Sequence, residues 1–253
     1  MLSKQEIQII RSLGIKKYRQ KYLKYLAEGE KICLEIIHAS TELIDTLYCL
    51  EDFHVRHVAI LENKAINYSV ISKKELQKIS QLKHPNNSLI VLNMPESGLN
   101  QETKNCNNIL YLDDISDPGN LGTIMRTVEW FGVELLLLSP NCVDPYNPKV
   151  VQSSMGSLFR IRFSIVELNH FLNNQERDFN VYIADMNGKN AFQTEFKNPS
   201  ILVLGNESQG VQLKLNDQAS EVISVPSAGS PTESLNVSIA GAILLAEMYK
   251  KNG

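Results

Sequence analysis

Polar side chains that could bind or activate a small ligand are concentrated in three short segments of the C-terminal half of the chain. They comprise two amides, a guanidinium, a carboxylate and a hydroxyl: Asn120, Arg126, Glu207, Ser234 and Asn236. The carboxylate follows an apolar run that predicts a buried strand, and the last two residues open an apolar helix. Strand ends and helix N-termini are where open α/β sheets bind small ligands, because backbone N–H groups point into the crevice there. The pattern therefore predicts a polar binding site at one edge of a sheet.

Each of these residues also has a purely structural interpretation. The rigid fork of Arg126 suits phosphate and ribose oxygens, but most arginines on helices are simply exposed. Asn120 could fix a loop or contact a ligand, or it could cap a helix. Glu207, with glycines on both sides at 205 and 210, could orient Arg126 as a carboxylate–guanidinium pair, act as a base if its pKa were raised, or only form a turn. Ser234 and Asn236 are well placed for capping.

Three motifs in one order resemble a known family. They are Asn120-Leu121-Gly122-Thr123-Ile124-Met125-Arg126, Leu204-Gly205-Asn206-Glu207-Ser208-Gln209-Gly210 and Glu233-Ser234-Leu235-Asn236-Val237-Ser238. They are similar to the first, second and third motifs of the SpoU/TrmH-like RNA ribose 2′-O-methyltransferases, in the SPOUT superfamily. The resemblance implies a C-terminal parallel-sheet α/β domain with a deep trefoil knot, a feature that no periodicity predicts because knots are nearly absent from proteins.

The resemblance also implies a reaction and a cofactor. The ribose hydroxyl would attack the methyl group of S-adenosylmethionine in line, with both reactants held in position. Arg126 would activate the hydroxyl; because arginine stays protonated in proteins, we expect it to orient the hydroxyl and stabilise developing negative charge rather than accept the proton. Asn120, Glu207, Ser234 and Asn236 would complete the catalytic centre. The residues expected to hold the cofactor lie in the knot loops: Leu204, Gly205, Val225, Pro226 and Leu235.

One departure from the family pattern falls in the last of these loops. Between Val225 and Leu235 the chain is one residue longer than the usual loop, through Ser230-Pro231-Thr232. No family position is therefore carried over to residues 227–232, and Pro231 and Thr232 receive no predicted role.

The elements that would position this site alternate along the C-terminal half. Strands are predicted at 109–112, 134–138, 181–184, 201–204 and 222–226, an extended segment at 159–165, and helices at 121–131, 148–157, 167–175 and 239–248. The loop 113–120 precedes the first of these helices, and Gly132 is predicted to cap its C-terminus. Strands alternating with helices predict a parallel sheet covered on both faces.

A second domain is predicted before residue 96. A helix is expected at 3–17, strands at 22–27, 43–50, 55–61 and 88–93, a helix after Glu30, and a capping-box helix opened by Ser72 and Glu75. This part is similar to the family's ribosomal-protein L30-like substrate-binding domain. The predicted division is 1–95 for the small α/β domain, 96–107 for a polar linker and 108–253 for the knotted domain.

The charge distribution favours RNA as the partner of the small domain. The net charge is −3, but residues 1–31 hold eight Lys and Arg against three Glu, or +5. Lys16, Lys17, Arg19 and Lys21 lie among tyrosines at 18, 22 and 25, a mixture that suits phosphates and unstacked bases. The alternative is a solvated helix face with the tyrosines packed underneath.

Several other classes of protein are not supported by the sequence. The four cysteines are scattered, and the His54 and His57 pair lacks further ligands, so no metal is expected. No phosphate-binding loop or dinucleotide fingerprint occurs. No apolar run approaches the ~20 residues of a membrane helix and no signal peptide is recognised, which predicts a cytoplasmic protein.

The function expected is S-adenosylmethionine-dependent ribose 2′-O-methylation of structured RNA by a homodimer. Ribosomal RNA is favoured over transfer RNA by the small domain, on family analogy. The alternatives are a transfer RNA methyltransferase, a catalytically silent RNA-binding or assembly protein, which would not bind the cofactor, and a small-molecule α/β enzyme, which would turn over without RNA.

Overall fold

The computed structural model describes residues 1–95, 105–212, 220–229 and 234–250. These residues form two compact units. The first unit takes the chain up to residue 95 together with 144–160, and the second takes the remainder.

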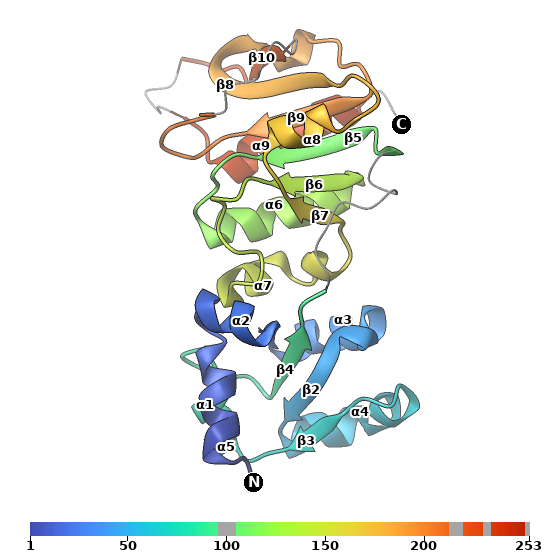
Figure 1. Cartoon of the computed structure of the whole chain (residues 1–253), viewed down its shortest axis with the longest axis vertical. Coiled ribbons are helices and arrows are strands. Elements are labelled where there is room, and N and C mark those ends of the chain that lie inside the picture. The colour runs from blue at the N-terminus through green and yellow to red at the C-terminus, as the bar shows by residue number, and fades with distance from the viewer. Residues whose placement is uncertain (96–104, 213–219, 230–233, 251–253) are drawn as a thin grey trace. The chain divides into compact units, whose positions relative to one another are not determined.

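The first unit is an α/β fold around a four-stranded sheet (Figure 1). Its strand order is β1-β4-β2-β3, with β4 antiparallel to both of its neighbours and β3 parallel to β2. Its elements up to residue 95, with the 3-10 helix η1, are α1 (Lys4–Ser12), α2 (Lys16–Tyr22), β1 (Lys24–Glu28), α3 (Glu30–Ala39), η1 (Thr41–Leu43), β2 (Ile44–Cys49), α4 (Glu51–Asn63), β3 (Tyr68–Val70), α5 (Lys73–Ile79) and β4 (Ser88–Asn93).

Local sequence signals account for most of these elements. The capping box predicted at Ser72 is present, because its side chain accepts from the Glu75 amide while the Glu75 carboxylate accepts from the Ser72 amide. The predicted helix 3–17 is instead two helices, since α1 ends at a C-cap at Leu13 and α2 begins after Gly14 and Ile15. The strand predicted at 55–61 is wrong. This stretch belongs to α4, whose buried residues Phe53 and Leu61 are eight apart and share one helix face.

Residues 144–160 pack within the first unit, although in the sequence they come between two strands of the second unit's sheet. They contain α7 (Pro148–Ser154) and the 3-10 helix η3 (Ser157–Phe159). The ring of Tyr25 on β1, 1% exposed, lies with its centroid 4.6 Å from that of Tyr146 and 6.4 Å from that of Phe159. The domain division predicted from the sequence assigns all of residues 108–253 to one domain, so it does not separate residues 144–160 from the second unit.

The second unit is built on a six-stranded sheet in which every neighbouring pair is parallel. Its strand order is β10-β8-β9-β5-β6-β7, so β9 and β5 occupy the centre. Its elements are β5 (Asn108–Leu112), α6 (Pro118–Phe131), β6 (Leu135–Leu138), β7 (Phe163–Ile165), α8 (Leu168–Asn173), β8 (Asn180–Asn190), the 3-10 helix η4 (Ala191–Gln193), β9 (Ser200–Leu204), β10 (Ser220–Ser224) and α9 (Val237–Tyr249).

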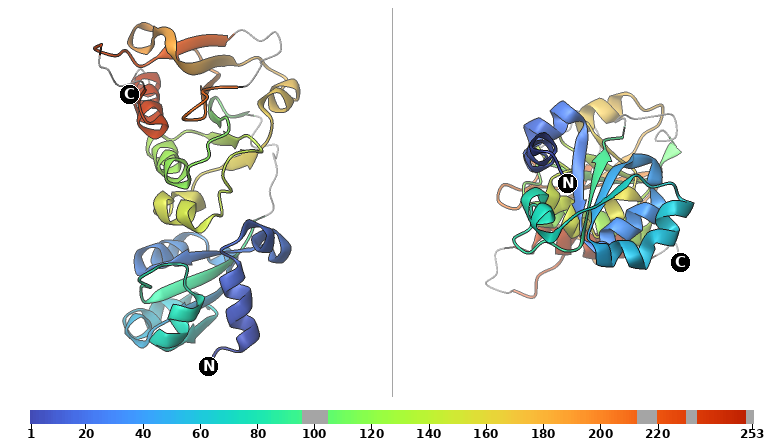
Figure 2. Two further views of the ribbon diagram at one scale, coloured as in Figure 1. Left: turned by 90° about the vertical axis from the view of Figure 1, so that its left-hand side faces the viewer. Right: turned by 90° about the horizontal axis from the view of Figure 1, so that it is seen from below.

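Helices cover both faces of this sheet, as the alternation of strands and helices predicted. On one face α8 packs Leu168 and Phe171 into a buried cluster with side chains of β5, β6, β8 and β9. On the other, α6 packs against α9 (Figure 2, left), and a Cβ at Gly241 of α9 would lie 2.6 Å from Cδ1 of Leu204. Glycine at 241 therefore lets α9 approach the end of β9 closely.

Three sequence-based expectations involve residues outside the described ranges. The linker includes 96–104, and the one-residue departure from the family loop includes 230–232. The path of the expected knot involves 213–219 and 230–233, so the knot stays a prediction from the fold family. Among the described residues, no helix is long and apolar enough to cross a membrane.

Candidate active site

A chain of three side chains joins the three motif segments at the carboxyl end of β9. Asn120 Nδ2 donates to Glu207 Oε1 at 2.6 Å, and Asn236 Nδ2 donates to Asn120 Oδ1 at 2.9 Å. All three residues are exposed or half-buried, so the chain is open to a ligand. We refer to Glu207, Asn120 and Asn236 as the polar relay. Its Asn120 amide uses its N–H and its oxygen on different partners, which fixes the orientation of the amide group.

Two helix N-termini position the relay. Asp117 caps α6, and its Oδ1 accepts from the Asn120 backbone amide at 2.8 Å. The helix thus begins at Pro118, earlier than predicted, and Asn120 lies in its first turn rather than at the cap. Asn236 is the cap of α9, where its Oδ1 accepts from the backbone amide of Ser238 at 2.9 Å and from the Ser238 hydroxyl at 2.6 Å. Capping and participation in the relay are therefore combined in Asn236.

The turn after β9 holds Glu207 in place. Asn206 and Gly210 exchange two backbone hydrogen bonds, at 3.0 and 2.9 Å, around a tight turn in which Gly210 has a φ of +68°. A Cβ at Gly205 would lie 2.3 Å from the Gly210 carbonyl carbon, so only glycine allows the turn to close. The Asn206 Nδ2 donates to the Asp114 carbonyl at 2.8 Å, which ties the turn to the loop that follows β5.

Asp114 and Ser139, which lie in the loops after β5 and β6, support this turn and were not identified from the sequence. Ser139, 2% exposed at the end of β6, donates its hydroxyl to Asp114 Oδ1 at 2.7 Å and accepts from the Asp114 amide at 2.9 Å. Asp114 adopts a φ of +56°, a conformation that Asp tolerates better than most residues. The signal available in the sequence was an acidic pair directly after a predicted strand.

Arg126 does not form the expected pair with Glu207. It is exposed, and within the described ranges no ion pair or hydrogen bond joins it to that carboxylate, which accepts from Asn120 instead. Six residues along a helix amount to a rotation of about 240°, so Arg126 projects from a different face of α6 than Asn120 does. Glu207 Oε2 has no hydrogen-bond partner in the described part of the chain.

The residues predicted to hold the cofactor lie in the loops around the relay or at the end of β10. Leu204 is buried, Gly205 begins the Glu207 turn, and Leu235 is 48% exposed beside Asn236. Val225 is half-buried and Pro226 exposed, directly after β10, and Ser234 is exposed. Among the residues that the structure describes, no hydrogen bond joins Val225, Pro226 or Ser234 to the relay.

The residues predicted to bind RNA divide into two groups. Lys16, Lys17 and Lys21 are exposed. Arg19 is 2% exposed and each nitrogen of its guanidinium has a protein partner: Nε and Nη2 donate to Asp144 Oδ2 at 2.9 and 2.6 Å, and Nη1 donates to the Leu13 carbonyl at 2.9 Å. The prediction that Arg19 contacts RNA is therefore wrong.

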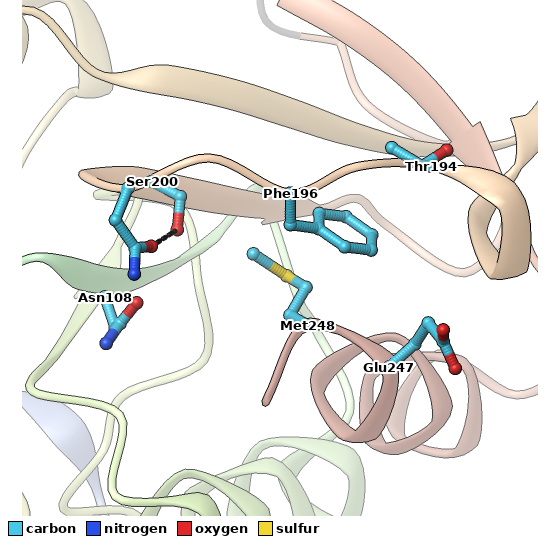
Figure 3. A pocket seen from close by; sticks show the side chains of 7 residues that line it. Asn108, Thr194, Phe196, Ser200, Glu247 and Met248 are labelled. Atoms are coloured by element: carbon cyan, nitrogen blue, oxygen red, sulfur yellow. Dashed lines mark hydrogen bonds between the residues drawn. The ribbon is translucent and has the colours of Figure 1, made fainter. Parts of the chain in front are cut away.

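A separate hollow lies in the second unit where β9 and β5 begin (Figure 3). Ser200 and Asn108, which begin β9 and β5, line it together with Phe196 and Met248. The Ser200 hydroxyl donates to Asn198 Oδ1 at 3.2 Å. Because the relay lies where β9 ends, this hollow is not part of the candidate site. Among the described residues, no group of three or more His, Cys, Asp or Glu could hold a metal ion.

Comparison with known proteins gives the site its context. Residues 107–246 match the model of the SpoU rRNA methylase family. The chain belongs to this family. Residues 4–89 match the MRM3-like substrate binding domain. The protein is thus a SpoU-family methyltransferase, with S-adenosylmethionine as its methyl donor and a substrate-binding domain before the catalytic one.

Relatives of known name span nearly the whole chain. The 23S rRNA (guanosine(2553)-2′-O)-methyltransferase RlmP of Bacillus subtilis is 28% identical over 95% of this chain and 94% of its own length. An AdoMet-bound rRNA methyltransferase structure from Sinorhizobium meliloti is 25% identical, covers 99% of this chain and 96% of that chain, and has a TM-score of 0.84. A structure from Porphyromonas gingivalis, described as a proposed RNA methyltransferase of the TrmH family, is 28% identical over 99% of both chains with a TM-score of 0.83.

Proposed function

We propose that the protein methylates the 2′-hydroxyl of a ribose in ribosomal RNA. The observation that carries the proposal is the polar relay, which unites one residue from each of the three motifs at the end of a central strand. Relatives named as rRNA methyltransferases support ribosomal RNA as the substrate class. Bound S-adenosylmethionine would supply an electrophilic methyl group on sulfur.

The residues of the relay would orient the acceptor hydroxyl. During transfer the hydroxyl oxygen forms a bond to the methyl carbon, the sulfur–carbon bond breaks, and the hydroxyl proton leaves. Glu207 Oε2, which has no partner within the described ranges, is open to accept a hydrogen bond from the substrate, because Asn120 holds the other carboxylate oxygen. Holding the reactants in line is the main source of rate gain available to such a site.

Arg126 would act on the substrate from outside the relay. Its guanidinium has no partner in the described ranges and stays protonated, so it can bind a phosphate or a developing oxyanion but cannot accept the proton. We expect it to contact the RNA backbone beside the target ribose, with a phosphate oxygen receiving the proton.

A homodimer is part of the proposal. The outward side of α9 is apolar, with Ile239 52% exposed and Ala246 exposed, and Trp130 on the adjoining α6 is 84% exposed. Apolar side chains on two packed helices suit an isologous interface between two copies. Sedimentation equilibrium at micromolar concentration should give twice the chain mass of 28.5 kDa, and a monomer would contradict this part of the proposal.

The decisive experiment combines the protein with S-adenosylmethionine carrying a labelled methyl group and ribosomal RNA lacking the modification. Label should enter the RNA and protect one linkage from alkaline cleavage, and the Arg126→Ala variant should lose most activity while still binding the cofactor. Labelling of transfer RNA alone would redirect the substrate assignment. Cofactor binding without labelling of any RNA would contradict the proposed activity, and absence of cofactor binding would favour a silent RNA-binding protein.

A further inference from the structure

The outer face of α2 in the first unit carries three lysines and no acidic residue of the helix itself. Lys16, Lys17, Gln20 and Lys21 are all exposed. At about 100° per residue these positions cover about 140° of the helix circumference, so they form one continuous face. The helix contains no acidic residue, and none of the three lysines forms an ion pair in the described part of the chain. We call Lys16, Lys17 and Lys21 the lysine face.

The aromatic rings of α2 lie on the other side of the helix. Tyr22 packs against the buried cluster that contains Leu13 and Leu26. Tyr18 stacks on Tyr22 with ring centroids 6.4 Å apart and planes 15° from parallel, and Lys21 Nζ lies 5.4 Å from the Tyr22 centroid. The sequence suggested that these tyrosines stack with unpaired bases. In the structure, the Tyr18 and Tyr22 rings stack on each other, and Tyr22 also contacts the buried cluster and Lys21.

We propose that the lysine face binds the sugar–phosphate backbone of the RNA substrate without reading base identity. The inference rests on the proposed function and adds which surface binds the RNA and what it recognises. Lysine ammonium groups are compact point charges suited to phosphate, and contacts to phosphate position a nucleic acid without specifying its sequence. Arg19 is a positioning residue, because its buried bonds to Asp144 and Leu13 pin the inner side of α2.

A matched control is available on another helix of the same unit. Lys73, Lys74 and Lys78 of α5 are exposed and have the same spacing as the lysine face. Replacing either set by glutamine removes three positive charges from a helix of 7 residues, so a general effect of net charge is equal in the two variants. The α5 helix differs in carrying Glu75 in its first turn.

The experiment measures RNA affinity of the full-length protein between 50 and 200 mM salt, using the RNA that the wild type methylates. In the lysine-face variant (K16Q, K17Q and K21Q), loss of three phosphate contacts should make the slope of log affinity against log salt less negative by about 2 to 3. Across this fourfold salt range, the variant should therefore lose about 20- to 40-fold less affinity than the wild type does. The α5 variant (K73Q, K74Q and K78Q) should keep the wild-type slope, and both should bind S-adenosylmethionine normally.

Several outcomes would overturn the inference. One is an unchanged slope in the lysine-face variant, and another is equal flattening in both variants. A third is a lysine-face variant that keeps its RNA affinity but loses binding to vesicles containing phosphatidylserine, which would assign the surface to membranes. Failure of the wild type to methylate RNA would instead contradict the proposed function, so the two failures are distinguishable.

Discussion

Replacing Arg19 by methionine should destabilise the first unit strongly. The substitution keeps an unbranched chain of similar bulk but removes three hydrogen bonds, two to Asp144 and one to the Leu13 carbonyl. The side chains of Arg19 and Asp144 are only 2% and 11% exposed, so water cannot replace the guanidinium as the partner of the Asp144 carboxylate. Removing one member of a buried pair costs about 3–5 kcal/mol. This corresponds to a population of unfolded first unit that is larger by a factor of roughly 10² to 4 × 10³.

Arg56→Met is the control for this substitution. Arg56 binds the carboxylates of Glu30 and Asp52, at 2.7 and 3.0 Å, but it is 49% exposed. Because exposed pairs contribute about 0–1 kcal/mol, its loss should hardly matter. Native-state hydrogen exchange of the β1 and β4 amides reads the difference directly. Equal exchange rates in the two variants would refute the burial argument, whereas Arg19→Met combined with Asp144→Leu should recover part of the stability because no charge is left unpaired.

Four further substitutions test other parts of the structure. Asn120→Asp should lower kcat at least tenfold with little change in cofactor affinity, because a second carboxylate would face Glu207; unchanged kcat would remove the relay from the mechanism. Gly205→Ala should abolish methyl transfer, since its Cβ would meet backbone at 2.3 Å, and full activity would show that the turn can open. Ser72→Ala should cost about 1 kcal/mol in urea unfolding without affecting activity, and an activity loss would contradict a purely structural cap. Burial raises the pKa of Glu28 in the folded state, so its ionisation opposes folding as pH rises; Glu28→Gln should be more stable than wild type at pH 7, with the advantage gone below pH 4.5, and a pH-independent difference would contradict this.

Local signals in the sequence predicted most of the fold. The apolar runs at 109–112 and 201–204 become the central strands β5 and β9, and Gly132 caps α6 in the left-handed conformation that favours glycine. The failure at 55–61 has a physical reason. Its β-branched residues favour strands only weakly, and burial of one face against the first unit's core decides in favour of a helix.

The arrangement of the site was harder to predict, because it depends on contacts between residues far apart in the sequence. Motif order identified the segments that carry Asn120, Glu207 and Asn236, but which amide donates to which oxygen depends on helix starts that a sequence places only to within a few residues. The Arg19 prediction failed for a related reason. Composition marked it as one of a basic cluster, whereas its partner Asp144 lies 125 residues away in the chain.

The placement of residues 144–160 has a consequence for how the chain folds during synthesis. The ring of Tyr25 lacks Tyr146 and Phe159, and the guanidinium of Arg19 lacks Asp144, until residue 160 has been translated, 65 residues after residue 95. At 5–20 residues per second this interval lasts roughly 3 to 13 s. The core of the nascent first unit therefore stays incomplete while the ribosome synthesises part of the second unit. A ribosome stalled before residue 144 should carry a protease-sensitive first unit, and one stalled well past residue 160 a resistant one.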